Sequence, residues 1–175
     1  MRAAIALLPL LLVACPQSDV GLPCNHGPGF VPQSQAITFP ALTCDHLLCV
    51  YAEDVEPPGL ECSNSDDCNE VSGEQQFRCE EGSCVLDQEY VMSRSMCSLS
   101  CESDGDCQGG EADTACKNGF TCARIQGLGD HCCEKLCVCR DDLDEATANR
   151  LEQECSADAA VGCCDKDPHP DACGS

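Results

Sequence analysis

Cysteine and histidine are the residues of this sequence with the greatest capacity for chemistry. There are 21 cysteines and four histidines, the latter being His26, His46, His131 and His169. The densest group, CCEKLCVC at 132–139 with His131 beside it, could hold Zn²⁺ or Cu⁺ through soft sulfur ligands; Cys24-x-His26 and Cys44-x-His46 suggest the same chemistry. The alternative is that the cysteines form disulfides. The compartment decides between the two, because thiolates persist mainly under reducing conditions.

Sequence signatures of catalysis are missing from the chain. It has no G-x-S-x-G, no H-E-x-x-H, no P-loop, no dinucleotide fingerprint and no C-x-x-C redox pair. Asp104-Gly105-Asp106 could offer oxygen ligands to Ca²⁺, but the stretch lacks the closing Glu of an EF-hand, and we expect a turn there. We therefore predict no enzyme activity, no catalytic residue, no cofactor and no metal.

The first fourteen residues have the features of an export signal. Arg2 and the amino terminus give a positive start, and residues 5–13 form an apolar run of nine residues. A membrane-spanning helix needs roughly 20 apolar residues, whereas the apolar part of a signal peptide has about 7–15. Ala14 supplies the small residue before a cleavage site. An exported chain meets oxidising conditions, so we expect disulfides instead of thiolate metal sites.

The next residue is a cysteine, and Leu12-Val13-Ala14-Cys15 resembles the lipobox of bacterial lipoproteins at all four positions. This resemblance implies that the Cys15 thiol carries diacylglycerol, that the signal is removed before it and that the new amino terminus is acylated. The alternative is an ordinary secretory signal. Pro16 differs from the aspartate that retains enteric lipoproteins at the inner membrane, which favours the outer membrane of the cell envelope.

Composition predicts a small fold that depends on disulfides. Without Cys15, twenty cysteines remain, an even number that can close ten bridges. Cysteine makes up about 12% of the sequence, tryptophan is absent and aromatic residues are only 3%. With few large side chains to bury, such exported chains use covalent bridges in place of a large core. The expected disulfide residues are Cys24, Cys44, Cys49, Cys62, Cys68, Cys79, Cys84, Cys97, Cys101, Cys107, Cys116, Cys122, Cys132, Cys133, Cys137, Cys139, Cys155, Cys163, Cys164 and Cys173.

The net charge of −22 limits the partners of the chain. Nucleic acids and anionic lipid surfaces attract lysine and arginine, so we predict no nucleic-acid partner and membrane association only through a covalent lipid. A basic protein or divalent cations are compatible with the charge, as is a simple role in solubility.

Two segments repeat the same cysteine order. Residues 62–84 (CSNSDDCNEVSGEQQFRCEEGSC) and 101–122 (CESDGDCQGGEADTACKNGFTC) align with Cys62 on Cys101, Cys68 on Cys107, Cys79 on Cys116 and Cys84 on Cys122. Serine and aspartate in both first gaps favour turns. Each repeat is therefore expected to be a small knot made of a turn and a short hairpin, with strands such as Ser83–Leu86 and residues 121–125.

The expected fold class is small and disulfide-rich, mostly loops with short β-hairpins and one short helix near 142–155. Asp142 is its candidate N-cap, with Glu145 three residues on, and we expect Cys155 to bolt the helix to the fold. Adjacent Cys132 and Cys133 should have different partners. The predicted organisation is a signal peptide (1–14), a lipid-anchored tether (15–43), two cysteine-rich units (44–92 and 93–140) and a C-terminal helix with a cysteine tail (141–175).

The stretch from Cys97 to Leu143 resembles a cysteine-rich module of exported lipoproteins of myxobacterial type. The matching residues are Cys97-x3-Cys101-Glu102-Ser103-Asp104-x-Asp106-Cys107, Cys116-x2-Gly119-Phe120-x-Cys122 and Cys132-Cys133-x-Lys135-Leu136-Cys137-Val138-Cys139. The C-x-x-S-D-x-D-C element is also similar to part of the Dickkopf N-terminal and whey-acidic-protein cysteine modules. The first resemblance implies a scaffold and a compartment but no activity.

These observations favour a lipid-anchored, non-catalytic interaction module of the cell envelope. A second interpretation is a protease inhibitor, which needs an exposed loop between cysteines, as residues 108–115 or 70–78 could supply. A third is a metal-binding protein with thiolate or calcium ligands.

Overall fold

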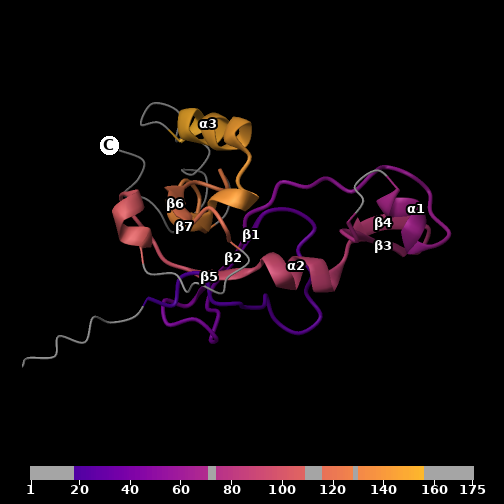
Figure 1. Ribbon diagram of the computed structural model, residues 1–175, viewed down its shortest axis with the longest axis horizontal. Coiled ribbons are helices and arrows are strands. Elements are labelled where there is room, and N and C mark those ends of the chain that lie inside the picture. The colour runs from indigo at the N-terminus through magenta and orange to yellow at the C-terminus, as the bar shows by residue number, and fades with distance from the viewer. Residues whose placement is uncertain (1–17, 71–73, 109–115, 128–129, 156–175) are drawn as a thin grey trace, which may run out of the picture.

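The computed structural model describes residues 18–70, 74–108, 116–127 and 130–155 (Figure 1). Its regular elements are short and joined by loops, which confirms the expected fold class. Their order is β1 (Ala36–Thr38), β2 (Leu48–Tyr51), α1 (Ser65–Asn69), β3 (Phe77–Glu80), β4 (Ser83–Leu86), α2 (Gln88–Arg94), β5 (Met96–Ser98), η1 (Asp104–Cys107), β6 (Phe120–Ala123), β7 (Leu136–Cys139), η2 (Arg140–Asp142) and α3 (Glu145–Glu154), where η denotes a 3₁₀ turn.

Strand β2 is the centre of the fold. It pairs antiparallel with β1 on one side and with β5 on the other. Because successive side chains of a strand point to opposite faces, Leu48 and Val50 pack against the β6–β7 hairpin, whereas Tyr51 packs against β3, β4 and α2. All four β2 residues are buried. One four-residue strand thus supplies both faces of a core that has few large side chains.

The segment expected to be a tether is folded into this core from residue 18 onwards. Val20 is fully buried against Cys107 and Cys137, and Cys24 is disulfide-bonded to Cys49. Strand β1 belongs to the same segment and pairs with β2. The three-stranded sheet therefore combines strands from three of the predicted units, and the boundaries at 43 and 92 do not separate bodies that pack independently.

The first knot, residues 62–86, is a short helix fastened to a hairpin. Asn64 caps α1 and forms a reciprocal capping box with Asp67. The β3–β4 hairpin turns tightly through Glu81 and Gly82, both at positive φ, as a two-residue hairpin turn requires. Two disulfides, Cys62–Cys79 and Cys68–Cys84, join α1 and its preceding residues to the hairpin.

The second knot, residues 101–139, repeats this design with equivalent contacts. Ser103 and Asp106 form the same capping box at η1. The Cys122 N–H donates to Asp104 in the second knot (2.9 Å), as the Cys79 N–H donates to the Ser65 hydroxyl in the first (3.3 Å).

Disulfides give the correct alignment of the repeats and correct the sequence alignment. Cys101 bonds Cys122 on β6, and Cys107 bonds Cys137 on β7. In each hairpin the third and fourth cysteines are opposite each other, Cys79 with Cys84 and Cys122 with Cys137. Matching Cys79 with Cys116 and Cys84 with Cys122 was therefore wrong. The strands of the second hairpin are joined by a long connection, residues 124–135, and an alignment based on the spacing between cysteines does not detect it. Cys116 forms an additional bridge to Cys139.

The predicted C-terminal helix is present as α3, but its N-cap is Asp144, whose carboxylate accepts from Thr147 N at 2.8 Å. Asp142 lies two residues earlier, in η2, where it is buried and pairs with Arg94. Because the Asp142 side chain pairs with Arg94, it does not cap α3 as the sequence pattern predicted. The predicted attachment of this helix to the fold through Cys155 is confirmed, since Cys155 is disulfide-bonded to Cys133.

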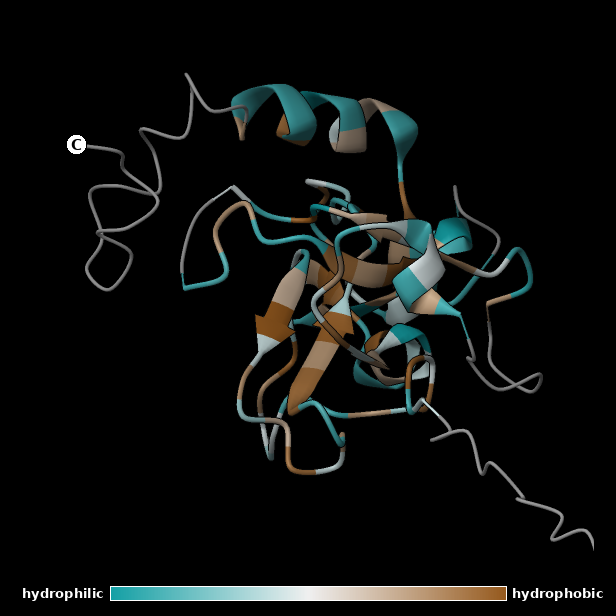
Figure 2. Cartoon of the chain, turned by 90° about the vertical axis from the view of Figure 1, so that its left-hand side faces the viewer, coloured by the Kyte–Doolittle hydropathy of each residue, from teal (hydrophilic) through white to brown (hydrophobic). Residues whose placement is uncertain are grey.

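Helix α2 was not predicted, although its signals were available. Asp87 caps it by accepting from the backbone N–H groups of Glu89 and Tyr90, and Arg94 occupies the last turn. In Figure 1, α2 leads from the first knot at one end of the long axis back to the central sheet. Figure 2 shows the largely polar α3 lying over the more apolar strands. Among the described residues, every helix falls short of the length and apolar character that a membrane span requires.

Candidate functional site

Every cysteine that the structure describes is disulfide-bonded. The eight described bridges are Cys24–Cys49, Cys44–Cys97, Cys62–Cys79, Cys68–Cys84, Cys101–Cys122, Cys107–Cys137, Cys116–Cys139 and Cys133–Cys155. Cys132 is also disulfide-bonded, and because Cys133 bonds Cys155, the adjacent pair has different partners as predicted. Cys15, Cys163, Cys164 and Cys173 lie outside the described residues. The sulfurs at 132–139, which the sequence offers as candidate metal ligands, are thus oxidised to disulfides.

The aspartates considered for Ca²⁺ bind backbone N–H groups and an arginine. Asp106 accepts from the N–H groups of Glu102 (3.0 Å) and Ser103 (2.8 Å), and these bonds lower the pKa of its carboxyl. Asp104 accepts from Cys122 N and pairs with Arg140 at 2.7 Å. The predicted turn is confirmed, with both carboxylates holding it in place.

His26 is buried between β1 and the end of α2. Its Nδ1 lies 2.7 Å from the Thr38 hydroxyl and its Nε2 lies 3.0 Å from the Ser95 hydroxyl. Since the Ser95 hydroxyl already donates to the Val91 carbonyl (2.7 Å), it accepts from His26 Nε2–H. Burial lowers the pKa of His26 to about 4, so the ring is neutral at pH 7.

This pair has the wrong polarity for nucleophilic catalysis. In an activated nucleophile the serine hydroxyl donates to the histidine, which takes its proton. Ser95 donates elsewhere and is 1% exposed, so no substrate reaches its oxygen. Of the other histidines, His46 lies 3.9 Å from Asp19 and His131 contacts Glu134 at 2.6 Å; His169 is outside the described residues.

A polar cluster with two buried carboxylate residues joins three distant parts of the chain, and sequence analysis missed it. Glu53 follows β2, Arg94 ends α2 and Asp142 lies in η2. Arg94 Nη1 donates to Asp142 Oδ1 at 3.0 Å, and Arg94 Nε lies 3.7 Å from Glu53 Oε1. The Tyr90 hydroxyl donates to Glu53 at 2.6 Å, and burial raises the pKa of the Tyr90 hydroxyl.

Asp142 has the most unusual carboxyl group of this cluster. Burial raises its pKa to about 6, and repulsion from Glu53 adds to the effect, while the Arg94 guanidinium opposes it. Perturbed carboxyl groups often mark active sites. The cavity beside Arg94 and Asp142, however, measures about 10 Å³, which is the size of one water molecule. The arrangement therefore fits a structural clamp between β2, α2 and η2.

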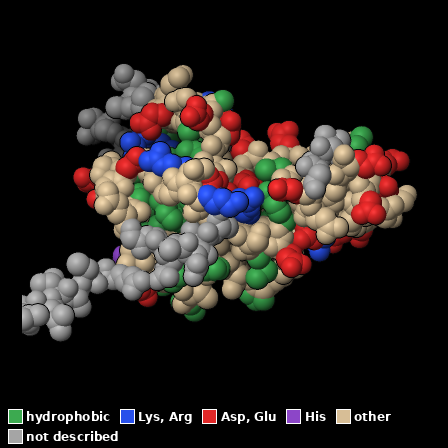
Figure 3. Space-filling view, viewed as in Figure 1, with side chains coloured by type: hydrophobic (Ala, Val, Ile, Leu, Met, Phe, Trp, Pro, Cys, Tyr) green, Lys and Arg blue, Asp and Glu red, His purple; other side chains and the backbone are tan. Residues whose placement is uncertain are grey.

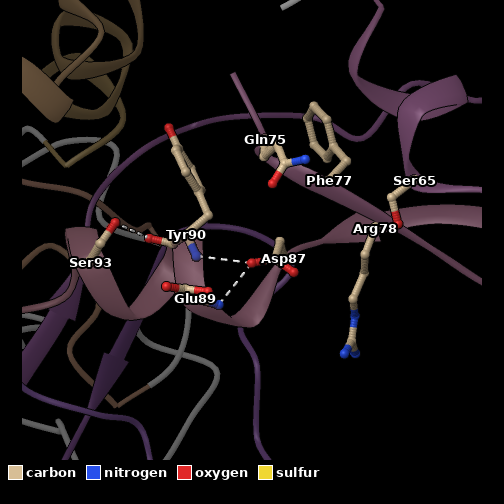
Figure 4. A pocket seen from close by; sticks show the side chains of 8 residues that line it. All are labelled: Ser65, Gln75, Phe77, Arg78, Asp87, Glu89, Tyr90 and Ser93. Carbon is tan, nitrogen blue, oxygen red and sulfur yellow. Dashed lines mark hydrogen bonds between the residues drawn. The ribbon is translucent and has the colours of Figure 1, made fainter. Parts of the chain in front are cut away.

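A groove between α2 and the first knot has a volume of about 500 Å³ (Figure 4). Arg78 extends from β3 on one wall, and Asp87, Glu89 and Tyr90 lie on the α2 wall. Arg78 pairs with Glu80 at 2.8 Å, while its Nε is buried without a hydrogen-bond partner among the described residues. The groove is open, it carries side chains of both charges, and the buried Phe77 lies at its edge.

The structure describes only part of the two loops suggested for protease inhibition. Residues 109–115 and 71–73 lie outside the described part. The end of the second loop is strand β3, where the Asn69 side chain accepts from the N–H groups of Gln76 (3.0 Å) and Phe77 (2.9 Å).

The fold and its bridges place the chain in the class of small disulfide-rich proteins. Comparison with family models, curated proteins and solved structures finds no match to this chain.

Proposed function

We propose that the chain is an exported, lipid-anchored protein of the bacterial cell envelope that acts as a non-catalytic interaction module. The observation that carries the proposal is the set of eight described disulfides around a core of short strands. A fold of this kind requires an oxidising compartment, because reduction would remove most of what restricts the unfolded chain.

Two sequence features support anchoring at Cys15. The segment 1–14 has the length and composition of an export signal, and Leu12-Val13-Ala14-Cys15 has the lipobox pattern. With Cys15 lipidated, the remaining cysteines are even in number and none needs an external partner. Three acyl chains would hold the protein firmly, since one chain alone binds only marginally. Pro16 favours the outer membrane.

The groove between α2 and β3 is the surface that we propose for a protein partner. Its two walls carry opposite charges, and the clamp of Arg94 with Asp142 and Glu53 fixes α2 in position behind it. The acidic surface of the chain suits a partner with basic residues.

Cys15→Ala tests the anchor, with Gln17→Ala as the control. In a bacterial host we expect the parent and the control in the membrane fraction, with a mass increase from acyl chains at a mature amino terminus beginning at residue 15. Cys15→Ala should lose both properties. An unmodified parent with an intact 1–14 segment would refute export and lipidation.

A photo-crosslinking residue at Glu89 tests the interaction role, with one at Gln153 on the exposed side of α3 as the control. The groove position should give a specific adduct that Arg78→Ala diminishes. Identical adducts from both positions would refute a role for the groove.

A further inference from the structure

Four exposed apolar side chains come from two loops that lie side by side near the start of the described chain. Leu42 is the most exposed of all described large hydrophobic side chains, at 86%, and Phe39 is 59% exposed. Leu22 and Leu47 are 38% and 36% exposed. Isolated exposed leucines are common on protein surfaces, but a group of this kind indicates a surface that contacts something apolar.

The loop with three of these residues, Phe39–Leu47, is rigidly held. Ala41 N donates to Leu47 O (2.7 Å), and Leu47 N donates to Cys44 O (3.0 Å). Cys44 and Ala41 are buried, and the disulfide Cys44–Cys97 fastens the loop to β5. The exposure of Leu42 is therefore imposed by the fold.

The chain's first described residues are bonded to this loop. The carboxylate of Asp19 accepts from Asp45 N, and its other oxygen lies 3.9 Å from His46 Nε2. Leu22 O accepts from Cys97 N at 2.7 Å, so the Leu22 segment adjoins the disulfide that holds the loop.

Cys15 precedes Asp19 by only four residues, and four residues span at most about 14 Å when fully extended. A lipid on Cys15 thus brings Asp19, and the loop bonded to it, within that distance of the bilayer. The headgroup layer on each side of the hydrocarbon is itself about 5–8 Å thick. Side chains that protrude from this loop can reach the lipid.

Charge favours the same orientation. Figure 3 shows hydrophobic side chains along the lower edge of the molecule, where Figure 1 has the indigo N-terminal segment. Acidic side chains gather over α1 and β4 at the far end. With the lower edge against the membrane, this acidic group over α1 and β4 is turned away from the anionic lipids that would repel it.

We infer that Phe39–Leu47 and Leu22 form a membrane-contact surface that lies in the headgroup region of the bilayer holding the Cys15 lipid. The inference rests on the proposed lipid anchor. It adds that the folded body is held against the bilayer in one orientation.

The absence of tryptophan makes a direct test simple. Leu42→Trp places a single fluorescent reporter on the proposed surface, and Phe39→Trp places a second one in the same loop. Leu60→Trp is the matched control, since Leu60 is also exposed (56%) but precedes the first knot. Each variant is bound to vesicles of phosphatidylethanolamine and phosphatidylglycerol with brominated acyl chains. We expect Leu42→Trp and Phe39→Trp to lose most of their fluorescence and shift to shorter wavelength, while Leu60→Trp changes little.

Two forms of the protein separate the two proposals. The natural lipidated protein is compared with the mature chain tethered through an N-terminal histidine tag to nickel-chelating vesicles. Unquenched loop reporters in both vesicle-bound forms overturn the contact surface and leave the anchor intact. A second outcome is that the natural chain carries no lipid and does not float with vesicles, while the reporters of the tagged form are quenched. That outcome overturns the anchor and supports the contact surface.

Discussion

Removing the bridge between Cys133 and Cys155 by changing both to serine should release α3 and leave the rest of the fold in place. The helix has ten residues and buries only Thr147 and Leu151 besides the bridged cysteine. Isolated helices shorter than about 12–15 residues are marginal in water. The helix therefore depends on its covalent attachment.

The magnitude follows from the closed loop. A separation of 22 residues predicts a chain-entropy contribution of about 3 kcal/mol. Burial of Leu151 contributes about 2 kcal/mol. The ion pairs of Glu152 with Arg124 and Lys135 add little, because Glu152 is 58% exposed. Ordering a helix costs about 1–2 kcal/mol per residue, so the remaining contacts are too few to retain it.

Hydrogen exchange followed by mass spectrometry measures the outcome. Amides of α3 should exchange rapidly in the double variant, while those of β2 and β7 stay protected. The control is the pair Cys62→Ser and Cys79→Ser, whose separation of 17 residues predicts a similar loss of about 3 kcal/mol, but with the exchange confined to the first knot. Unchanged protection of α3 in the Cys133/Cys155 variant would refute the reasoning.

Three further predictions concern pH. Burial lowers the pKa of His26 from 6.5 to about 4. The contribution of the neutral His26 to stability is therefore complete above pH 6.5 and falls by about 3 kcal/mol as the pH drops towards 4. In urea unfolding, His26→Gln should remove this dependence of stability on pH, and an imidazole that titrates near 6.5 by NMR would contradict the prediction. Burial raises the pKa of Asp142 from 3.8 to about 6, so stability changes with pH in the opposite direction. The contribution of the protonated Asp142 carboxyl to stability is complete below pH 3.8 and falls by about 3 kcal/mol as the pH rises through 6. Asp142→Asn should flatten that change, and an identical pH profile in parent and variant would count against it. Backbone N–H bonds lower the pKa values of Asp67 and Asp106, so the stability they add is present above about pH 3.8 and lost below it; Asp67→Asn and Asp106→Asn should each unfold less steeply in an acid titration followed by circular dichroism.

Much of the local structure could be predicted from residue types alone. The Ser-Asp turns are present because aspartate three residues after a cap can accept the preceding backbone N–H groups, and this needs no distant partner. The helix near 142–155 was predicted from its apolar spacing. Its first turn was misplaced, because the pattern could not show that Arg94, 48 residues away, binds Asp142.

The repeat shows the same division. Four cysteines in the same order identified two related knots, but their pairing depends on which strands face each other. A hairpin with a two-residue turn and one with a connection at 124–135 place their opposed cysteines at different sequence spacings. Counting along the chain therefore aligned Cys116 where Cys122 belongs.

The sequence by itself determined the fold class, the dependence on disulfides and the local caps, because cysteine content, scarce large apolar residues and short-range hydrogen bonds are properties of composition and neighbouring residues. Only the tertiary structure decided which cysteines bond, that residues 18–43 join the core, and that Glu53, Arg94 and Asp142 meet. These features depend on contacts between distant segments, and a single β2 strand, buried on both faces, brings those segments together.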